Sequence, residues 1–203
     1  MTDRLELEKE LFEQGIWPVC GCDEAGAGPL AGPVCAGAVI LTPETFIEGL
    51  DDSKKLSEKK REALYAVITE KAVAWAVAFV EPWEIDQINI LNARMKAMDM
   101  AIRSLKTPAV YALIDGNQSR GISLPCQTVL KGDSRVYSMA AASILAKVSR
   151  DRLMEEYDKA YPQYGFAKHK GYGTAAHYAA LREFGACPIH RVSFLKKGLH
   201  EEK

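Results

Sequence analysis

The sequence predicts a single α/β domain, and three observations lead to that prediction. The chain has 203 residues, of which 48% are hydrophobic, which is enough to bury one core. Short apolar runs of strand length alternate with longer stretches that have the apolar spacing of amphipathic helices. One run, at residues 110–114, is apolar at nearly every position, as expected of a central strand buried on both faces. No repeat, low-complexity tract or linker divides the sequence, so residues 1–203 are predicted to form one domain.

Five short apolar runs are predicted to be strands. They lie at residues 18–23, 34–41, 74–80, 110–114 and 127–130. Because a short glycine-containing loop joins the first two runs, we expect them to be antiparallel neighbours. The first run is expected to end at the pair Asp23-Glu24, and the fourth ends at Asp115-Gly116.

Helices are predicted where apolar residues recur every three or four positions. They lie at residues 4–14, 57–71, 89–106, 136–160 and 174–184, with one further short helix that begins at Pro82. Ser57, Asn89 and Thr174 are expected N-caps, since each can accept a free N–H of the first turn. Residues 164–173 are predicted to be an exposed loop, and 188–203 an irregular or extended tail. A short helical and extended segment therefore completes the domain from about residue 164.

The charge balance limits the partners of this chain. It has 26 Lys and Arg residues against 27 Asp and Glu residues, a net charge of -1, so any binding of nucleic acid has to be local. The first ten residues lack the apolar core of a signal peptide, and no later run is long enough to span a bilayer. We therefore expect a cytoplasmic protein outside the membrane. Because the tail shows no clear partner-binding motif, we expect a monomer.

The cysteines are expected to be buried free thiols. They are Cys20, Cys22, Cys35, Cys126 and Cys187. Their number is odd, most lie in apolar stretches, and no two form a C-x-x-C pair. These features disfavour a disulfide scaffold or a zinc site.

Four carboxylates are the candidate catalytic residues, because each adjoins a predicted strand. Asp23 and Glu24 end the first strand. Asp115 ends the central strand, and Asp133 opens the helix after the last one. Each has an alternative role: the pair can lie in a solvated turn, Asp115 can form a turn before glycine, and Asp133 can cap a helix. Binding sites of α/β sheets form at strand ends, so the common position of the four favours a shared site.

Clustered carboxylates require compensating cations, because like charges raise one another's pKa. These motifs offer only oxygen ligands and no histidine, so Mg²⁺ or Mn²⁺ is expected before Zn²⁺. Two such ions suit in-line displacement at phosphorus, one activating a water molecule and the other stabilising the leaving oxygen. The predicted reaction is phosphodiester hydrolysis.

Residues near the acids are candidate substrate ligands. Gly26 and Gly28 permit a sharp turn that brings backbone N–H groups close to an anion. Lys54 and Lys55 are either an ordinary solvated pair or a grip on phosphates beside the scissile bond. Tyr172, between two glycines, is a candidate for stacking on a sugar or base.

The dipeptide His190-Arg191 also has two interpretations. It can bind phosphate, or it can hold the tail against the core. We favour the structural role.

Seven motifs follow one another along essentially the whole chain. They are DEAG at 23–26, GPLAGP at 28–33, DSKKLS at 52–57, IDGN at 114–117, KGDS at 131–134, AASILAKV at 141–148 and HKGYGT at 169–174. Together they closely resemble the motifs of bacterial ribonuclease HII, a type 2 ribonuclease H. The resemblance implies an RNase H-like fold, in which three antiparallel strands are continued by parallel ones in a central mixed five-stranded sheet flanked by helices.

The resemblance also implies an activity. Ribonuclease HII cuts the RNA strand of RNA–DNA hybrids and incises 5′ of single ribonucleotides embedded in duplex DNA, leaving 3′-hydroxyl and 5′-phosphate ends. By position, Asp23, Glu24, Asp115 and Asp133 resemble its catalytic carboxylates, which bind two Mg²⁺ or Mn²⁺ ions in the substrate complex. Tyr172 resembles the residue that stacks on the deoxyribose at the RNA-to-DNA junction.

Position 27 departs from the family pattern. Gly26 and Gly28 resemble the glycines of a Gly-Arg-Gly motif, whose backbone reads the ribonucleotide 2′-hydroxyl and holds the neighbouring phosphate. Here Ala27 replaces the arginine, so the amide donors remain while a cation is lost. We expect metal binding to be preserved and recognition of a single embedded ribonucleotide to weaken, unless Lys54 or Lys147 compensates.

Two other functions fit the same residues. A Mg²⁺-dependent nuclease or phosphatase without a ribonucleotide requirement would use the same carboxylates. A hybrid-binding protein impaired in catalysis by Ala27 would bind tightly and cut poorly. Comparing an all-DNA duplex with one that carries a single ribonucleotide separates the nucleases.

Overall fold

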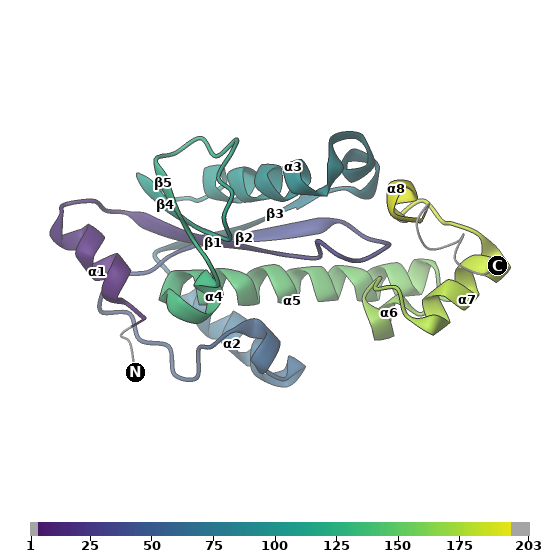
Figure 1. Cartoon of the computed structure of the whole chain (residues 1–203). Coiled ribbons are helices and arrows are strands. Elements are labelled where there is room, and N and C mark those ends of the chain that lie inside the picture. Colours follow the sequence, from purple (N-terminus) through teal and green to yellow (C-terminus); the bar gives the residue numbers. More distant parts are fainter. Residues whose placement is uncertain (1–3, 196–203) are drawn as a thin grey trace.

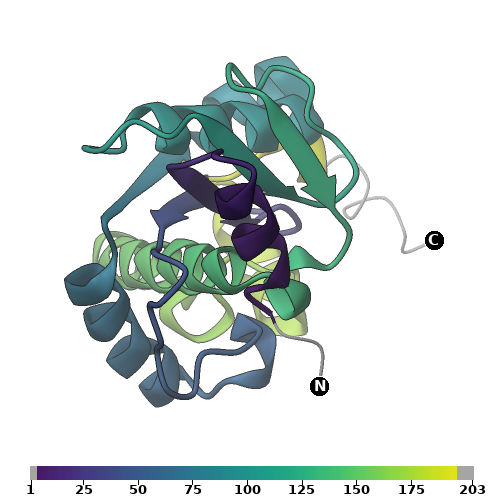
Figure 2. The ribbon, with the colours of Figure 1, turned by 90° about the vertical axis from the view of Figure 1, so that its left-hand side faces the viewer.

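The computed structural model of the protein describes residues 4–195. Its strands are β1 Val19–Ala25, β2 Val34–Ile40, β3 Ala74–Val80, β4 Tyr111–Asp115 and β5 Cys126–Val129. Its helices are α1 Glu6–Glu13, the 3-10 turn η1 Ser53–Lys55, α2 Glu58–Lys71, α3 Pro82–Arg103, α4 Gly132–Arg135, α5 Tyr137–Ala160, α6 Phe166–His169, α7 Ala175–Phe184 and α8 Val192–Leu195. The sheet lies between α3 on one face and α5 on the other, and α6, α7 and α8 gather at one end (Figure 1). The view from the end that carries α1 shows the same layers (Figure 2).

The five strands form one mixed sheet in the order β3-β2-β1-β4-β5. β1, β2 and β3 pair antiparallel, whereas β4 runs parallel to both β1 and β5. This topology confirms the predicted mixed five-stranded sheet. The carboxyl ends of β1 and β4 lie beside each other, because the last pair in their ladder is Cys22 with Ile114. Asp23 and Asp115 follow directly after that pair.

Helix α5 lies unusually close to the sheet. A Cβ atom on Gly21 would lie 2.5 Å from the backbone nitrogen of Met139, and one on Gly37 would lie 2.4 Å from the carbonyl oxygen of Ala142. Residues 140–142 of the helix are alanines without exposed surface. This alanine run packs closely on the sheet, and the packing depends on glycines in the strands that face it.

Helix α3 covers the opposite face and bends at Asn89, whose φ is 65°. The Asn89 side chain accepts the Asn92 N–H at 3.1 Å, which confirms its predicted role as a cap. Met95 and Met98 are buried in the core. Leu91 belongs to the same apolar stripe of the sequence but is 46% exposed, because the helix starts again at Asn89 and its first turn faces solvent.

Two predictions about loops were wrong. Strand β1 continues through Ala25 instead of ending at residue 23, because its pairing with β2 extends to Cys35. The segment 164–173 contains helix α6 and is not an exposed loop, since the buried rings of Tyr164 and Phe166 stack at 5.3 Å.

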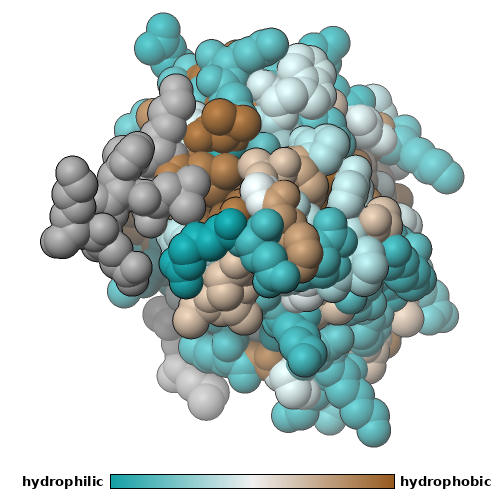
Figure 3. Space-filling model, turned by 90° about the vertical axis from the view of Figure 1, so that its right-hand side faces the viewer, coloured by the Kyte–Doolittle hydropathy of each residue, from teal (hydrophilic) through white to brown (hydrophobic). Residues whose placement is uncertain are grey.

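The predicted irregular tail forms helix α8 at its start, and residues 196–203 lie outside the described part. All five cysteines are free thiols, as predicted, but only Cys20, Cys22 and Cys35 are buried, whereas Cys126 and Cys187 are half-buried. Within residues 4–195 no helix is both long and apolar enough to cross a bilayer. Hydrophilic residues predominate on the face at the α7 and α8 end, where apolar residues occupy a small area (Figure 3).

The contact between Gly37 and α5 generates the first prediction. Gly37→Ala should lower the free energy of unfolding by about 1–3 kcal/mol, because the added methyl group meets a backbone oxygen and the helix has to shift. Urea unfolding followed by circular dichroism measures this change. In a strand without such a clash, replacing glycine by alanine stabilises, so an increase in stability would show that the helix does not lie this close.

Candidate active site

A cleft of about 240 Å³ opens beside the carboxyl ends of β1 and β4. Eight of the ten residues predicted for the site line it: Asp23, Glu24, Gly26, Ala27, Gly28, Lys54, Asp115 and Tyr172. They come from strand ends, the glycine loop, the η1 turn and the segment after α6. The fold therefore brings together residues that are up to 149 positions apart in the chain. Asp133 and Lys55, the remaining two, do not line the cleft.

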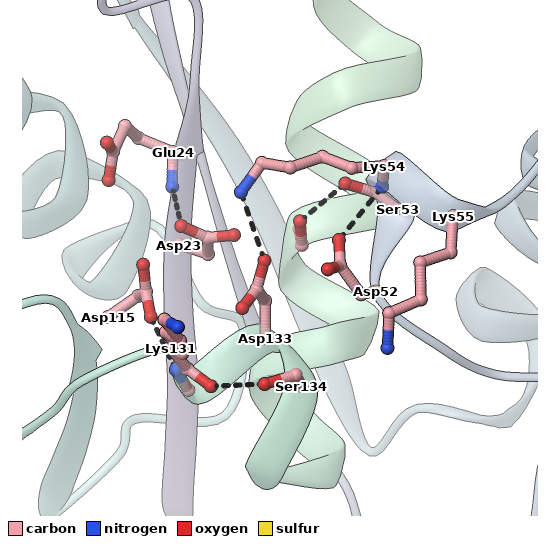
Figure 4. A network of polar contacts seen from close by, with 12 residues as sticks. Asp23, Glu24, Asp52, Ser53, Lys54, Lys55, Asp115, Lys131, Asp133 and Ser134 are labelled. Atoms are coloured by element: carbon pink, nitrogen blue, oxygen red, sulfur yellow. Dashed lines mark hydrogen bonds and ion pairs between the residues drawn. The ribbon is translucent and has the colours of Figure 1, made fainter.

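Asp23 and Glu24 leave strand β1 in different directions (Figure 4). Since β1 still pairs with β2 here, Glu24 opposite Ala36, the strand keeps its alternation of faces. Asp23 is buried, and the Glu24 carboxylate contacts the Arg94 guanidinium of α3 at 2.5 Å. The expectation that the pleat ends at this pair was therefore wrong. A shared ion would have to lie at the edge of the sheet between the two faces.

Asp115 and Asp133 are joined by the start of helix α4. The Asp115 carboxylate accepts the Gly132 N–H at 2.6 Å. Asp133, one residue further, is buried, and its Oδ2 lies 3.2 Å from the Lys54 ammonium. Asp133 thus adjoins the cleft through Lys54, which crosses toward it in Figure 4.

Two of these carboxylates form ion pairs with basic side chains. Arg94 pairs with Glu24, and Lys54 pairs with Asp133. As the side chains stand, residues 4–195 contain no group of three or more His, Cys, Asp or Glu side chains arranged to hold an ion. Rotation of the Glu24 and Asp133 side chains away from their cations would be needed to complete a metal site.

Three of these acids are destabilised as anions by burial. Burial, reinforced by the charges of Glu24 and Asp115, raises the pKa of Asp23 well above its ordinary value. Burial also raises the pKa of Glu24, although Arg94 opposes the rise, and burial raises the pKa of Asp115. The Oε2 atom of Glu24 is buried without a hydrogen-bond partner. Four acidic groups with too few cations and an unsatisfied carboxylate oxygen fit hard divalent ions.

Only one of the two predicted lysines faces the cleft. The Ser53 hydroxyl lies 2.8 Å from the Ser143 hydroxyl of α5, and this contact anchors the η1 turn so that Lys54 reaches the acids. The Lys55 ammonium instead lies 3.5 Å from Asp51 and points away from the carboxylates in Figure 4. Its predicted contact with substrate stays a prediction.

Tyr172 stands at the rim of the cleft with 46% of its surface exposed. A Cβ atom on Gly28 would lie 3.7 Å from its ring, so the ring lies beside the glycine loop. The Leu30 N–H donates to the Gly171 carbonyl at 2.8 Å. The loop that carries Tyr172 and the glycine loop are thereby joined.

Arg150 of helix α5 also joins the glycine loop to the loop that carries Tyr172, from the buried side. It is 1% exposed and donates to the carbonyls of Pro33, Ala31 and Lys170 at 2.9, 3.0 and 2.9 Å. Gly26 lies against it with a φ of +89°, and a Cβ atom there would be 2.0 Å from the arginine Nε. Only glycine fits that position, both for its backbone angle and for its space.

Arg191 supports the glycine loop from the other side. Its guanidinium is buried and donates to the carbonyls of Gly26, Ala27 and Gly32. These bonds tie the segment after α7 to the loop. Of the two interpretations of His190-Arg191, the structural one is confirmed for Arg191.

Sequence reasoning missed Arg94, Arg150 and Ser143 as parts of the site. Ala146 and Met154 lie four residues before and after Arg150, and both are buried. The position of Arg150 on the buried face of the helix could therefore have been predicted from the sequence. Ser143 and Arg94 also have buried neighbours at helical spacing, but their contacts do not follow from that pattern. Their roles depend on which element packs beside them.

The sheet topology and the acids together define the class of protein. Two parallel strands end at a cleft lined by Asp23, Glu24 and Asp115, with Asp133 adjoining it. Three antiparallel strands continue that sheet, and helices cover both faces. This is an RNase H-like fold with an acidic centre, the arrangement of a nuclease.

Comparison with known proteins identifies the family. A family model described as Ribonuclease HII matches residues 20–197. A ribonuclease HII of Dechloromonas aromatica is 58% identical over 176 residues, covering 87% of this chain and 90% of that protein. One of Acetivibrio thermocellus is 52% identical over 189 residues, covering 93% of this chain and 74% of that protein. The crystal structure of ribonuclease H2 from Pyrococcus horikoshii OT3 is 27% identical with a TM-score of 0.71, covering 88% of this chain and 95% of that chain.

The chain belongs to the ribonuclease HII family. It is accordingly a nuclease, a hydrolase that acts as an endoribonuclease on RNA–DNA hybrids. Within that activity, the finer choice of substrate and the roles of individual residues depend on the cleft described above.

The pKa shift of Asp23 generates the second prediction. The folded protein holds a proton on Asp23 more tightly than the unfolded chain does, so stability without metal falls as pH rises above about 4. With EDTA present, Asp23→Asn should therefore be more stable than the wild type at pH 8, and the gap should close toward pH 4. With Mg²⁺ present, the same variant should lose activity. Thermal unfolding across this pH range measures it. A variant less stable than the wild type at pH 8 would contradict the charge repulsion.

Proposed function

We propose that the protein also incises duplex DNA on the 5′ side of embedded ribonucleotides, leaving 3′-hydroxyl and 5′-phosphate ends. The observation that supports this best is that three of the four acids, the Gly26–Gly28 loop and Tyr172 line one cleft, with Asp133 adjoining it through Lys54. A phosphodiester bond beside a ribonucleotide can reach the acids while the loop and the ring contact the sugars on either side. We further propose that the protein works in the cytoplasm as a monomer.

Four carboxylates would hold two Mg²⁺ or Mn²⁺ ions in the substrate complex: Asp23, Glu24, Asp115 and Asp133. Such ions, when bound, activate water and stabilise the leaving oxygen. The chain contributes by fixing these ligands on rigid elements, through the bond from Gly132 to Asp115 and the burial of Asp23 and Asp133. Lys54 is close enough to contact a phosphate once it leaves Asp133.

Recognition of the ribonucleotide is assigned to the backbone of Gly26–Gly28 and to Tyr172. Backbone N–H groups can bond both the 2′-hydroxyl and the adjacent phosphate, and the 2′-hydroxyl is the group that separates RNA from DNA. The Tyr172 ring is exposed enough to stack on the next sugar. Lys55 is also proposed to contact substrate, after release from Asp51.

An end-labelled DNA duplex with one internal ribonucleotide tests this function. We expect metal-dependent incision on the 5′ side of that ribonucleotide, and no cleavage of an all-DNA duplex or by Asp115→Asn. Equal cleavage of the all-DNA duplex would instead support a Mg²⁺-dependent nuclease without a ribonucleotide requirement. Cleavage of an RNA–DNA hybrid alone would mean that junction recognition is lost while the acidic centre works.

Ala27 generates the third prediction. Ala27→Arg should raise kcat/KM on the single-ribonucleotide duplex by about tenfold to a hundredfold, because a charge-assisted bond to phosphate contributes roughly 1.5–3 kcal/mol. The side chain at this position lines the cleft, and the other basic candidate, Lys147, is paired with Asp151 at 2.7 Å. Steady-state kinetics measure the change, with Ala27→Gln as a control of similar length without charge. An unchanged rate would show that other cations already supply this contact.

A further inference from the structure

Arg191 is a buried cation whose bonds all go to backbone carbonyls. Its Nη2 donates to Gly26 at 2.6 Å, its Nη1 to Ala27 at 3.0 Å and its Nε to Gly32 at 2.9 Å. No ion pair to its guanidinium occurs within residues 4–195. The charge of Asp86 and the Phe194 ring, whose centroid lies 5.1 Å from the guanidinium carbon, offset the burial of this cation only in part, because burial still lowers its pKa.

These bonds fix the direction of two N–H groups. The peptide bonds of the loop are trans, and in a trans peptide the carbonyl of one residue and the N–H of the next point in opposite directions. Arg191 holds the carbonyls of Gly26 and Ala27 inward. The N–H groups of Ala27 and Gly28 therefore point away from the arginine.

The direction away from Arg191, in which the two N–H groups point, is toward the cleft. Gly26, Ala27 and Gly28 line the cleft, whereas Arg191 is fully buried behind them. Neither the Ala27 nor the Gly28 N–H has a hydrogen-bond partner in the described part of the chain. Two adjacent backbone donors thus face the cleft unused.

The arginine also strengthens these donors. A hydrogen bond from a cation to a peptide carbonyl polarises that peptide, and polarised groups bond more strongly at their other end. Burial lowers the pKa of Arg191 to about 9, which leaves it charged at neutral pH. Arg150 places a second buried guanidinium beside the same loop. Two buried cations therefore lie behind these donors although position 27 carries no charge.

We propose that Arg191 is a positioning residue for ribonucleotide recognition: it holds the Ala27 and Gly28 N–H groups toward the cleft, where they bond a 2′-hydroxyl and a phosphate oxygen. This inference rests on the proposed function and extends it to a residue that never touches the substrate. In this chain the buried cations Arg191 and Arg150 provide charge that Ala27 cannot provide.

Arginine suits this role and lysine does not. The planar guanidinium presents its donors in a fixed fork, so one side chain can span three carbonyls. A lysine at position 191 would offer a single nitrogen, and burial lowers the pKa of lysine more readily than that of arginine. Arg191→Lys therefore removes the fork that holds the three carbonyls.

The test compares the full-length wild type with Arg191→Lys and a control, Arg152→Lys. Arg152 lies on the outer side of α5, where it pairs with Glu62 outside the cleft. Binding to a duplex with one ribonucleotide and to the matching all-DNA duplex is measured by fluorescence anisotropy, with Ca²⁺ in place of Mg²⁺ because its looser coordination is expected to slow hydrolysis. Thermal unfolding checks that each variant is folded.

The preference for the ribonucleotide is the Kd for the all-DNA duplex divided by the Kd for the duplex with one ribonucleotide. We expect this ratio to fall at least about tenfold in Arg191→Lys, equivalent to about 1.4 kcal/mol, and to stay within about twofold of the wild-type value in the control. A purely structural role would lower stability without changing this ratio. If the folded Arg191→Lys variant keeps the wild-type ratio, the positioning role is overturned while the proposed function stands. If the wild type binds the two duplexes equally, the loop does not read the 2′-hydroxyl on binding and the positioning role is overturned, whereas the proposed function is decided by the incision assay.

Discussion

Helix α5 can lie against strands β1 and β2 only because Gly21 and Gly37 have no side chains, and the cleft depends on that contact. Ser143, Lys147 and Arg150 follow one another at helical spacing along α5, and all three line the cleft. One helix therefore supports both the acidic centre, where Ser143 anchors the η1 turn, and the glycine loop, which Arg150 holds. A shift of α5 by the width of a methyl group would move both parts of the site at once.

The cleft is divided by charge. The strand ends carry acids whose pKa values are raised by burial, whereas buried arginines lie behind the glycine loop. A phosphodiester substrate is an anion, so it needs cations at the acidic end and finds backbone donors at the other. This division explains how a chain with a net charge of -1 can bind nucleic acid locally.

Much of the fold could be predicted from the sequence, because these features depend on residues that are close together in the chain. Strand 110–114 is apolar throughout, and the caps at Ser57, Asn89 and Thr174 all accept the predicted N–H groups. The four acids were readable because each adjoins a strand. Other features depend on packing between distant segments: the extension of β1 to Ala25, the opposite faces of Asp23 and Glu24, the turn of Lys55 toward Asp51, and the burial of α6. The sequence shows that Ala27 lacks the charge of the family arginine. It does not show that Arg150 and Arg191 lie beneath the loop, because both are far from it in sequence.

Whether the four carboxylates bind metal together is tested most directly by anomalous diffraction from crystals soaked in Mn²⁺. Anomalous peaks within bonding distance of Asp23, Glu24, Asp115 and Asp133, with the Glu24 side chain released from Arg94 and Asp133 from Lys54, are the predicted result. Peaks elsewhere, or no peak at saturating Mn²⁺ while Glu24 stays paired with Arg94, would contradict a metal-dependent centre at these residues.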